Sequence, residues 1–279
     1  MGGYWEATLV LLSINVILAY SAFLPLSAGQ LNLGVAGFMA IGAYVSAWFS
    51  NEYGVFAIGA ALIGSAAAGL VAFALGIPVL RARAAYLAIA TLALGEVVRG
   101  TAINLKFVGA AAGYPVASYL GLAVIGPMAL IVVALVAYLY STRFGLSVVA
   151  VEDDERVADL LGMNVRMIRV WAFGLGGALA GLGGALYAHH FSFIEGQSFT
   201  VLLSVYIVLY VILGGVQSVL GPLFGAAFFT LLPELFRMGK EWRYVLFAAA
   251  VILLMAWRPQ GLLTANPIAH WLRRSNARA

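Results

Sequence analysis

Long apolar segments alternate with short polar stretches along the whole chain. Charged residues are absent from residues 7–51, 53–80, 107–142, 170–194 and 196–233. Because a membrane-spanning helix needs about 20 residues, the longest of these stretches can hold two spans each. The pattern predicts about nine spans, near residues 6–25, 31–50, 55–80, 85–104, 119–141, 170–192, 199–213, 217–236 and 243–257. The region around Gly214 and Gly215 also fits a re-entrant pair, so the predicted number is eight to ten.

Composition identifies lipid as the solvent of this chain. Hydrophobic residues make up 64% of it and the mean hydropathy is +1.02, whereas a soluble domain is roughly half apolar. A closed β-barrel would show alternating polarity in short strands, but these apolar runs are continuous and of helical length. We therefore predict an all-α polytopic membrane protein, with a single transmembrane domain over residues 1–279.

Basic residues are distributed unequally between the two predicted sides. Alternating spans place ten arginines on one side and five basic residues on or near the other. The first group is Arg81, Arg83, Arg143, Arg156, Arg166, Arg169, Arg258, Arg273, Arg274 and Arg278. The positive-inside rule makes that side cytoplasmic, together with a loop at 142–169 and a tail at 258–279. Since the bases neither cluster nor alternate with exposed aromatic residues, a nucleic-acid partner is not expected.

The predicted loop at 142–169 concentrates charge. Five of the eleven acidic residues occur there, namely Glu152, Asp153, Asp154, Glu155 and Asp159. An aspartate at 153 or 154 is suited to cap a helix, whose first turn favours acids. Two interpretations are open, a solvated connecting loop and a docking element for a cytoplasmic partner. No P-loop motif surrounds Lys106 or Lys240, so energy for transport would come from another chain, which favours docking.

The same stretch has the pattern of a short amphipathic helix. Val157, Leu160 and Leu161 recur at i, i+3 and i+4 and give a narrow apolar face. Gly162 and Asn164 are suited to end the helix. The spacing predicts one helix of about three turns, roughly 13 Å long, which is too short to span a membrane.

Several sequence blocks resemble one transporter family. "RVADLLG" (156–162) is similar to the E-A-A-x-x-x-G loop by which bacterial ABC importer permeases engage their ATPase; Ala158 and Gly162 match it, whereas Arg156 and Val157 depart from it. The other blocks follow in order: "LSAGQLNLGVAGFMAIGAYVSA", "YLAIATLALGEVVR", "RFGLSVVAVEDDERVADLLGMNV", "LAGLGGALYAHHFSFI", "LGGVQSVLGPLFGAAFFTLLPELFR" and "RPQGLL". Over most of its length the chain resembles the permease family of branched-chain amino acid ABC transporters.

The resemblance implies an architecture and a function. The chain would be a multi-pass permease subunit in a bacterial inner membrane, moving branched-chain amino acids with ATP hydrolysed elsewhere. Its partners would be cytoplasmic ABC ATPases, a second homologous permease and an extracytoplasmic substrate-binding protein, with no cofactor and no catalytic site. The segment assigned to the ATPase contains Glu152, Asp153, Asp154, Glu155, Ala158 and Gly162. Two alternatives stay open: a permease for urea, short amides or aromatic acids, and a self-contained secondary carrier or channel.

Two charges lie within a predicted span. Glu96 and Arg99 are three residues apart, hence on one helix face, and charge inside a membrane is costly enough to indicate function. We expect them, with Thr91 of the same block, to border the translocation pathway. The alternative is an interfacial ion pair in which Arg99 extends toward the headgroups.

Small residues and histidines complete the picture. Gly174, Gly177, Gly181 and Gly184 repeat at a spacing of 3-4-3, which places bare backbone on one helix face for close packing in lipid. A second small-residue face contains Ala36, Ala40, Ala43 and Ala47. His189 and His190 are adjacent and point about 100° apart on a helix, so we expect interfacial polar residues and no metal site. Cysteine is absent, which excludes thiolate ligands.

Overall fold

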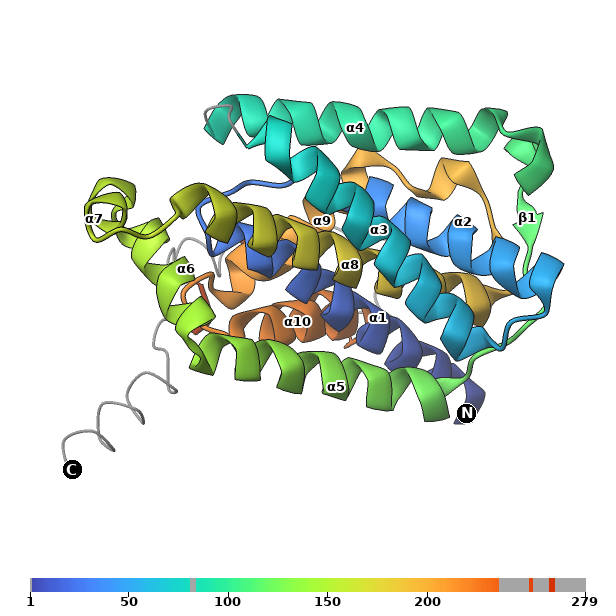
Figure 1. Ribbon diagram of the computed structural model, residues 1–279. Helices are drawn as coiled ribbons and strands as arrows, with labels where there is room; N and C mark the ends of the chain where they lie inside the picture. The colour runs from blue at the N-terminus through green and yellow to red at the C-terminus, as the bar shows by residue number, and fades with distance from the viewer. Residues whose placement is uncertain (1, 81–83, 236–250, 253–260, 264–279) are drawn as a thin grey trace.

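The computed structural model describes residues 2–80, 84–235, 251–252 and 261–263. Its long helices run side by side in one bundle (Figure 1). The α-helices of the described residues, of which α6 and α7 are short, are α1 (Gly2–Leu26), α2 (Val35–Tyr53), α3 (Ala57–Val79), α4 (Ala84–Asn104), α5 (Leu122–Ser141), α6 (Arg143–Asp153), α7 (Glu155–Leu160), α8 (Val165–Phe191), α9 (Val201–Gly214) and α10 (Gly221–Leu235). The prediction of an all-α polytopic membrane protein is confirmed at this level.

The two ends of the bundle differ in structure. At one end lie the short elements η1 (Lys106–Val108), η2 (Ala110–Ala112), β1 (Tyr114–Pro115), β2 (Phe193–Ile194) and η3 (Gly196–Ser198). The strands β1 and β2 pair antiparallel, with Tyr114 opposite Ile194. At the other end, α6 and α7 project from the bundle (Figure 1). These are called the β1–β2 end and the α6–α7 end below.

Five helices of the described residues are long and apolar enough to cross a membrane by length and composition: α1, α3, α4, α5 and α8. The apolar α9 has only 14 residues, about 21 Å, which is shorter than a hydrocarbon core of about 30 Å. The number of about nine spans stays a prediction. The predicted span at 243–257 lies outside the described residues except for Val251 and Ile252, as does the tail at 258–279 except for residues 261–263.

Helix α8 occupies the middle of the bundle, in contact with α1, α2 and α3 (Figure 1). A side chain at Gly177 or Gly181 would overlap the Cβ atoms of Ala72 and Ala68 on α3, and one at Gly184 would overlap the Met39 carbonyl on α2. Small residues let helix backbones approach this closely, which is how helices associate without a hydrophobic driving force.

The remaining predicted small residues also face neighbouring helices. A Cβ added at Gly174 would lie 3.1 Å from the ring of Phe73 on α3. The alanine face of α2, which consists of Ala36, Ala40, Ala43 and Ala47, is buried throughout. Small residues therefore lie at the close contacts among α2, α3 and α8.

Candidate functional site

The α6–α7 segment (residues 143–160) begins at a sharp corner after α5. Thr142 has extended backbone (φ −90°, ψ 177°), and its hydroxyl accepts a hydrogen bond from the Phe144 N–H at 3.3 Å. This is the geometry of a helix N-cap. A side chain at Gly145 would overlap the backbone of Tyr140. Glycine therefore lets α6 turn back against the end of α5.

Asp154 separates α6 from α7. Its backbone is extended (φ −155°, ψ 105°), and its Oδ1 accepts hydrogen bonds from the N–H groups of Arg156 and Val157 at 2.9 and 3.1 Å. Asp154 is thus one of the two predicted caps. The helix begins after the predicted cap, but the predicted length of about three turns is wrong, because α7 has only six residues, fewer than two turns.

Gly162 ends α7 in a left-handed conformation, with φ +80°. The Gly162 N–H donates to Asp159 O at 2.9 Å and the Met163 N–H donates to Ala158 O at 3.1 Å. This pair of bonds is a Schellman motif, which favours glycine at its left-handed position. The helix ends at the predicted glycine, whereas Asn164 caps α8 through a bond from the Met167 N–H at 3.0 Å. The segment predicted as a loop at 142–169 is therefore largely helical.

Helix α7 presents two opposite faces. Ala158 is 1% exposed and packs with Val151 of α6 and Val165 of α8, so it holds α7 against the rest of the chain. The predicted apolar face points outward: Leu160 is 86% exposed, and Val157 and Leu161 are also exposed. Of the residues assigned to the ATPase, Ala158 is thus turned away from the surface that a partner could reach.

An ion pair connects α7 to α8. The Arg169 guanidinium contacts Glu155 at 2.9 Å and donates to the carbonyl of Ala28 at 3.3 Å. The other predicted acids, Glu152, Asp153 and Asp154, are exposed on the same segment. Together with the bases around them they line a polar cleft of about 1310 Å³.

The acids of this segment do not have identical environments. Partial burial raises the pKa of the Glu152 carboxyl, and the neighbouring Asp153 carboxylate raises it further by repulsion. Both effects disfavour the ionised form. The ionised form of Glu152 is therefore less favourable in this structure than in the unfolded chain.

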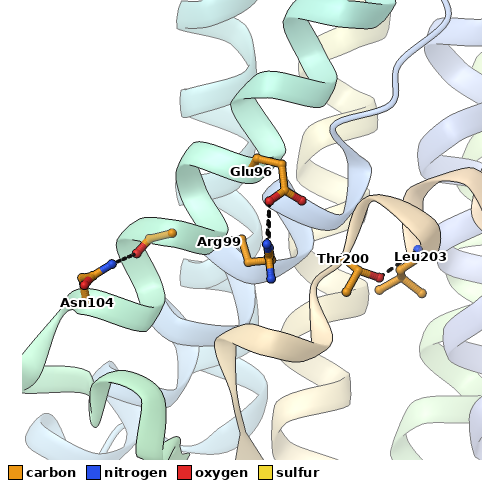
Figure 2. Close-up of polar contacts among 6 residues, drawn as sticks. Glu96, Arg99, Asn104, Thr200 and Leu203 are labelled. Atoms are coloured by element: carbon orange, nitrogen blue, oxygen red, sulfur yellow. Dashed lines mark hydrogen bonds and ion pairs between the residues drawn. The ribbon is translucent and has the colours of Figure 1, made fainter.

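Glu96 and Arg99 form an ion pair on α4. The Arg99 guanidinium contacts Glu96 Oε2 at 2.7 Å, and the two side chains are 38% and 32% exposed for Glu96 and Arg99 respectively. Figure 2 shows both on the side of α4 toward the start of α9 at Thr200, with Asn104 pointing away. The pair is accessible from outside the bundle and faces another helix of the chain.

Thr91 does not join this ion pair. It is 1% exposed, and its hydroxyl accepts a hydrogen bond from the Leu33 N–H at 3.0 Å. Leu33 belongs to the α2 lead-in, defined as residues 30–34, which has no regular secondary structure and lies between α1 and α2. On α9, Ser204 accepts from the Ala36 N–H at 2.9 Å. Side chains of α4 and α9 therefore hold the start of α2.

His189 is fully buried, which corrects the expectation of an interfacial residue. Its Nε2 contacts Ser46 Oγ at 2.7 Å and its Nδ1 contacts Ser118 Oγ at 2.8 Å. Ser118 also bonds to Ser50 Oγ at 2.7 Å. His190 lies beside it and contacts Leu120 O at 3.0 Å. The network joins α2, α8 and the stretch after β1, and no spacing in the sequence indicates it.

Metal chemistry was not expected from the sequence. Within the part of the chain that the structure describes, no group of three or more His, Cys, Asp or Glu side chains is placed to hold a metal ion.

The fold and these sites define a multi-pass membrane protein with a charged helical element projecting from its bundle. The chain belongs to the family described as branched-chain amino acid transport system / permease component, which it matches over residues 4–256. The predicted resemblance is therefore confirmed.

Individual relatives agree with this family. The chain is 32% identical to the high-affinity branched-chain amino acid transport system permease protein LivM of Escherichia coli (strain K12), over 92% of this chain and 69% of LivM. LivM of Salmonella typhimurium has the same identity and coverage. The autoinducer 2 import system permease protein LsrC of Salmonella paratyphi B is 33% identical over 57% of this chain and 46% of LsrC. No solved structure matches the chain.

Proposed function

We propose that this chain is the membrane-spanning permease subunit of an ATP-binding cassette importer for branched-chain amino acids. It would work in a bacterial cytoplasmic membrane, with ATP hydrolysed by a separate subunit. Family membership over residues 4–256 and the similarity to LivM over 92% of the chain support this substrate class.

The exposed face of α7 carries the proposal of ATPase coupling. Leu160, the last residue of α7, and Leu161, which follows it, are 86% and 72% exposed, and α7 projects from the bundle (Figure 1). Apolar side chains so placed are typical of surfaces that a partner covers. Acids at the start of α7, including Glu155, would add charge-assisted contacts at the rim.

Topology and partners follow from this docking. The α6–α7 end faces the cytoplasm, as the arginine distribution also indicates. The β1–β2 end then faces outward and receives the substrate-binding protein. A second homologous permease completes the pathway within the membrane.

Glu96 and Arg99 are the proposed charged elements of the pathway. Their side chains are about one third exposed and lie on the side of α4 toward α9. A zwitterionic amino acid carries one ammonium and one carboxylate, so it can meet both charges in turn. Thr91 contributes indirectly, by holding the α2 lead-in against α4.

The deciding experiment is ATPase retention by variants of the α7 face. Leu160→Ser combined with Leu161→Ser should leave the protein folded but weaken retention of co-expressed ATPase subunits. Losing one well-buried contact typically costs about 1–3 kcal/mol, or roughly 5- to 150-fold in affinity. Leu146→Ser is the matched control, since Leu146 is 66% exposed on the neighbouring α6. Equal retention by the double variant and the control would refute docking through α7.

Transport assays separate the alternatives. In proteoliposomes holding the complex, uptake of leucine, isoleucine and valine should require ATP and should not be competed by urea, short amides or aromatic acids. Uptake by the chain alone, driven by an ion gradient, would instead identify a secondary carrier.

A further inference from the structure

The turn between α1 and α2 is packed against the helices at the α6–α7 end. Ala28 is fully buried, in contact with Val148 of α6 and Ala172 of α8. The N–H groups of Ala28 and Gln30 both donate to Pro25 O at 3.0 Å. Because its backbone N–H groups are paired within the turn and the preceding helix end, packing and side-chain bonds connect it to these neighbours, so the turn can shift as a unit when they move.

Arg169 connects this turn to α7. Its NH2 contacts Glu155, the first residue of α7, at 2.9 Å, and its Nε donates to Ala28 O at 3.3 Å. A planar guanidinium can serve both partners at once, which an ammonium group cannot do in the same geometry. The Arg169 side chain is 22% exposed against 57% for Glu155, so the arginine lies on the protected side of the pair.

Beyond the turn, the chain leads to the proposed pathway. The α2 lead-in is bound by Thr91 of α4 through Leu33, and the first turn of α2 is bound by Ser204 of α9. The ion pair of Glu96 and Arg99 lies on α4, on the side toward α9 (Figure 2). A displacement of the turn can therefore reach α4, which carries this pair, and α9, toward which the pair points.

Gln30 is a buried polar residue at the end of this turn. The residue is 1% exposed, and neither polar atom of its side chain has a partner among the described residues. Burying an unpaired amide is unfavourable. A shift of the turn that supplies a partner for Gln30 would recover part of this cost.

We propose that Arg169 is a positioning residue that transmits movement of α7 to the α2 lead-in. The inference rests on the proposed function, since α7 is displaced by the ATPase docked on its exposed face. When α7 moves, Glu155 moves with it. Its ion pair with Arg169 displaces the guanidinium, and the hydrogen bond from the guanidinium to Ala28 O displaces the turn. Arg169 itself touches neither substrate nor ATP.

The test compares two arginines in the reconstituted complex. Arg169→Gln should retain the ATPase, but leucine transported per ATP hydrolysed should fall about 5-fold or more, the lower range of typical coupling between sites. Arg166→Gln is the control: Arg166 lies one turn earlier on α8 and donates to Ile77 O of α3 at 2.8 Å. It removes the same charge without touching the turn, so its transport per ATP should stay near wild type.

Arg169→Lys covers the case in which Arg169→Gln does not fold. The lysine keeps the charge but reaches only one partner, so a normal unfolding temperature with reduced transport per ATP supports the inference. Wild-type transport per ATP in whichever variant folds overturns it. If the wild-type chain retains no ATPase, the proposed function fails instead, and the two failures are thereby distinguished.

Discussion

The two ends of the molecule are held by different kinds of interaction. At the β1–β2 end, Ser118 and His189 form a buried hydrogen-bond network, and Asn51 bonds to the backbone on both sides of Val116. At the α6–α7 end, Ala158 packs in a small cluster, while Leu160 projects outward. The first end is held mainly by polar hydrogen bonds, and the second by a small apolar cluster beside an exposed apolar side chain.

This difference fits the roles proposed for the two ends, which are contact with the substrate-binding protein at one and contact with the ATPase at the other. In the proposed topology, the hydrogen-bond network at the β1–β2 end would keep the helices in register where substrate arrives, because paired buried polar networks favour one arrangement. In the same proposal, the α6–α7 end would be moved by the ATPase, since regions with few buried apolar contacts open at low free energy. Between the two ends, α2 and α8 pack closely at Gly42 and Gly181, and both ends are attached to this packed middle.

The largest expected effect comes from breaking that shared middle. Gly181→Leu would force a side chain into the Cβ of Ala68 on α3. The Gly181 backbone is also packed closely against α2, since a Cβ added at Gly42 would overlap it. Overpacking typically costs about 1–3 kcal/mol, and contact with a helix on each side should exceed that range. The yield of monodisperse protein in detergent should collapse, and both ends should be lost together.

The matched control is Gly100→Leu on α4, because a Cβ at Gly100 has no heavy atom within 4 Å. It should be purified at nearly the wild-type yield. Normal yield and unfolding temperature for Gly181→Leu would show that the middle can adapt, and that the ends do not depend on it.

The next largest effect is expected at the β1–β2 end. His189→Ala leaves Ser46 and Ser118 without the ring nitrogens that they contact. Leaving buried polar groups unpaired costs about 1–3 kcal/mol. The unfolding temperature in detergent should fall clearly, whereas His190→Ala, which loses one hydrogen bond at a partly buried site, should change it less. Equal shifts for the two histidines would contradict the special role of this network.

The ion pair on α4 should affect transport more than stability. An exposed ion pair contributes about 0–1 kcal/mol to folding. If the Glu96 carboxylate binds the substrate ammonium, Glu96→Gln loses a charged hydrogen bond worth about 1.5–3 kcal/mol, roughly 10- to 150-fold in apparent affinity. Uptake by the complex measures this effect. Asn104→Ala, on the side of α4 away from α9, should transport normally (Figure 2); unchanged uptake by Glu96→Gln would remove Glu96 from the pathway.

The sequence predicts the class of the protein and the location of its charged segment, because the length of an apolar run and the capping of a helix depend on residues that are close together in the sequence. Asp154 and Gly162 act at the ends of α7 for such local reasons. Helix α6 escaped prediction, because its buried Val148 packs against Ala28 and Ala172, which are distant in the sequence. The inward face of Ala158 and the network of His189 depend on residues far along the chain, and periodicity does not show such contacts.

The smallest expected effect concerns the pH response of the α6–α7 end. Since partial burial and then Asp153 raise the pKa of Glu152 above 4.5, the folded state holds this proton more tightly than the unfolded chain. The stability contributed by protonated Glu152 is fully present below pH 4.5 and is lost as the pH rises through the folded-state pKa. Glu152→Gln keeps the neutral form, so at pH 7 the unfolding temperature should match wild type or exceed it slightly. Because Glu152 is exposed, the gain should stay within about 0.5 kcal/mol, and it should shrink as the pH is lowered toward 4.5. If the variant unfolds at a lower temperature at pH 7, the charge of Glu152 stabilises this end, as polar contacts stabilise the opposite end. A difference that does not change with pH would show that it does not come from titration of Glu152.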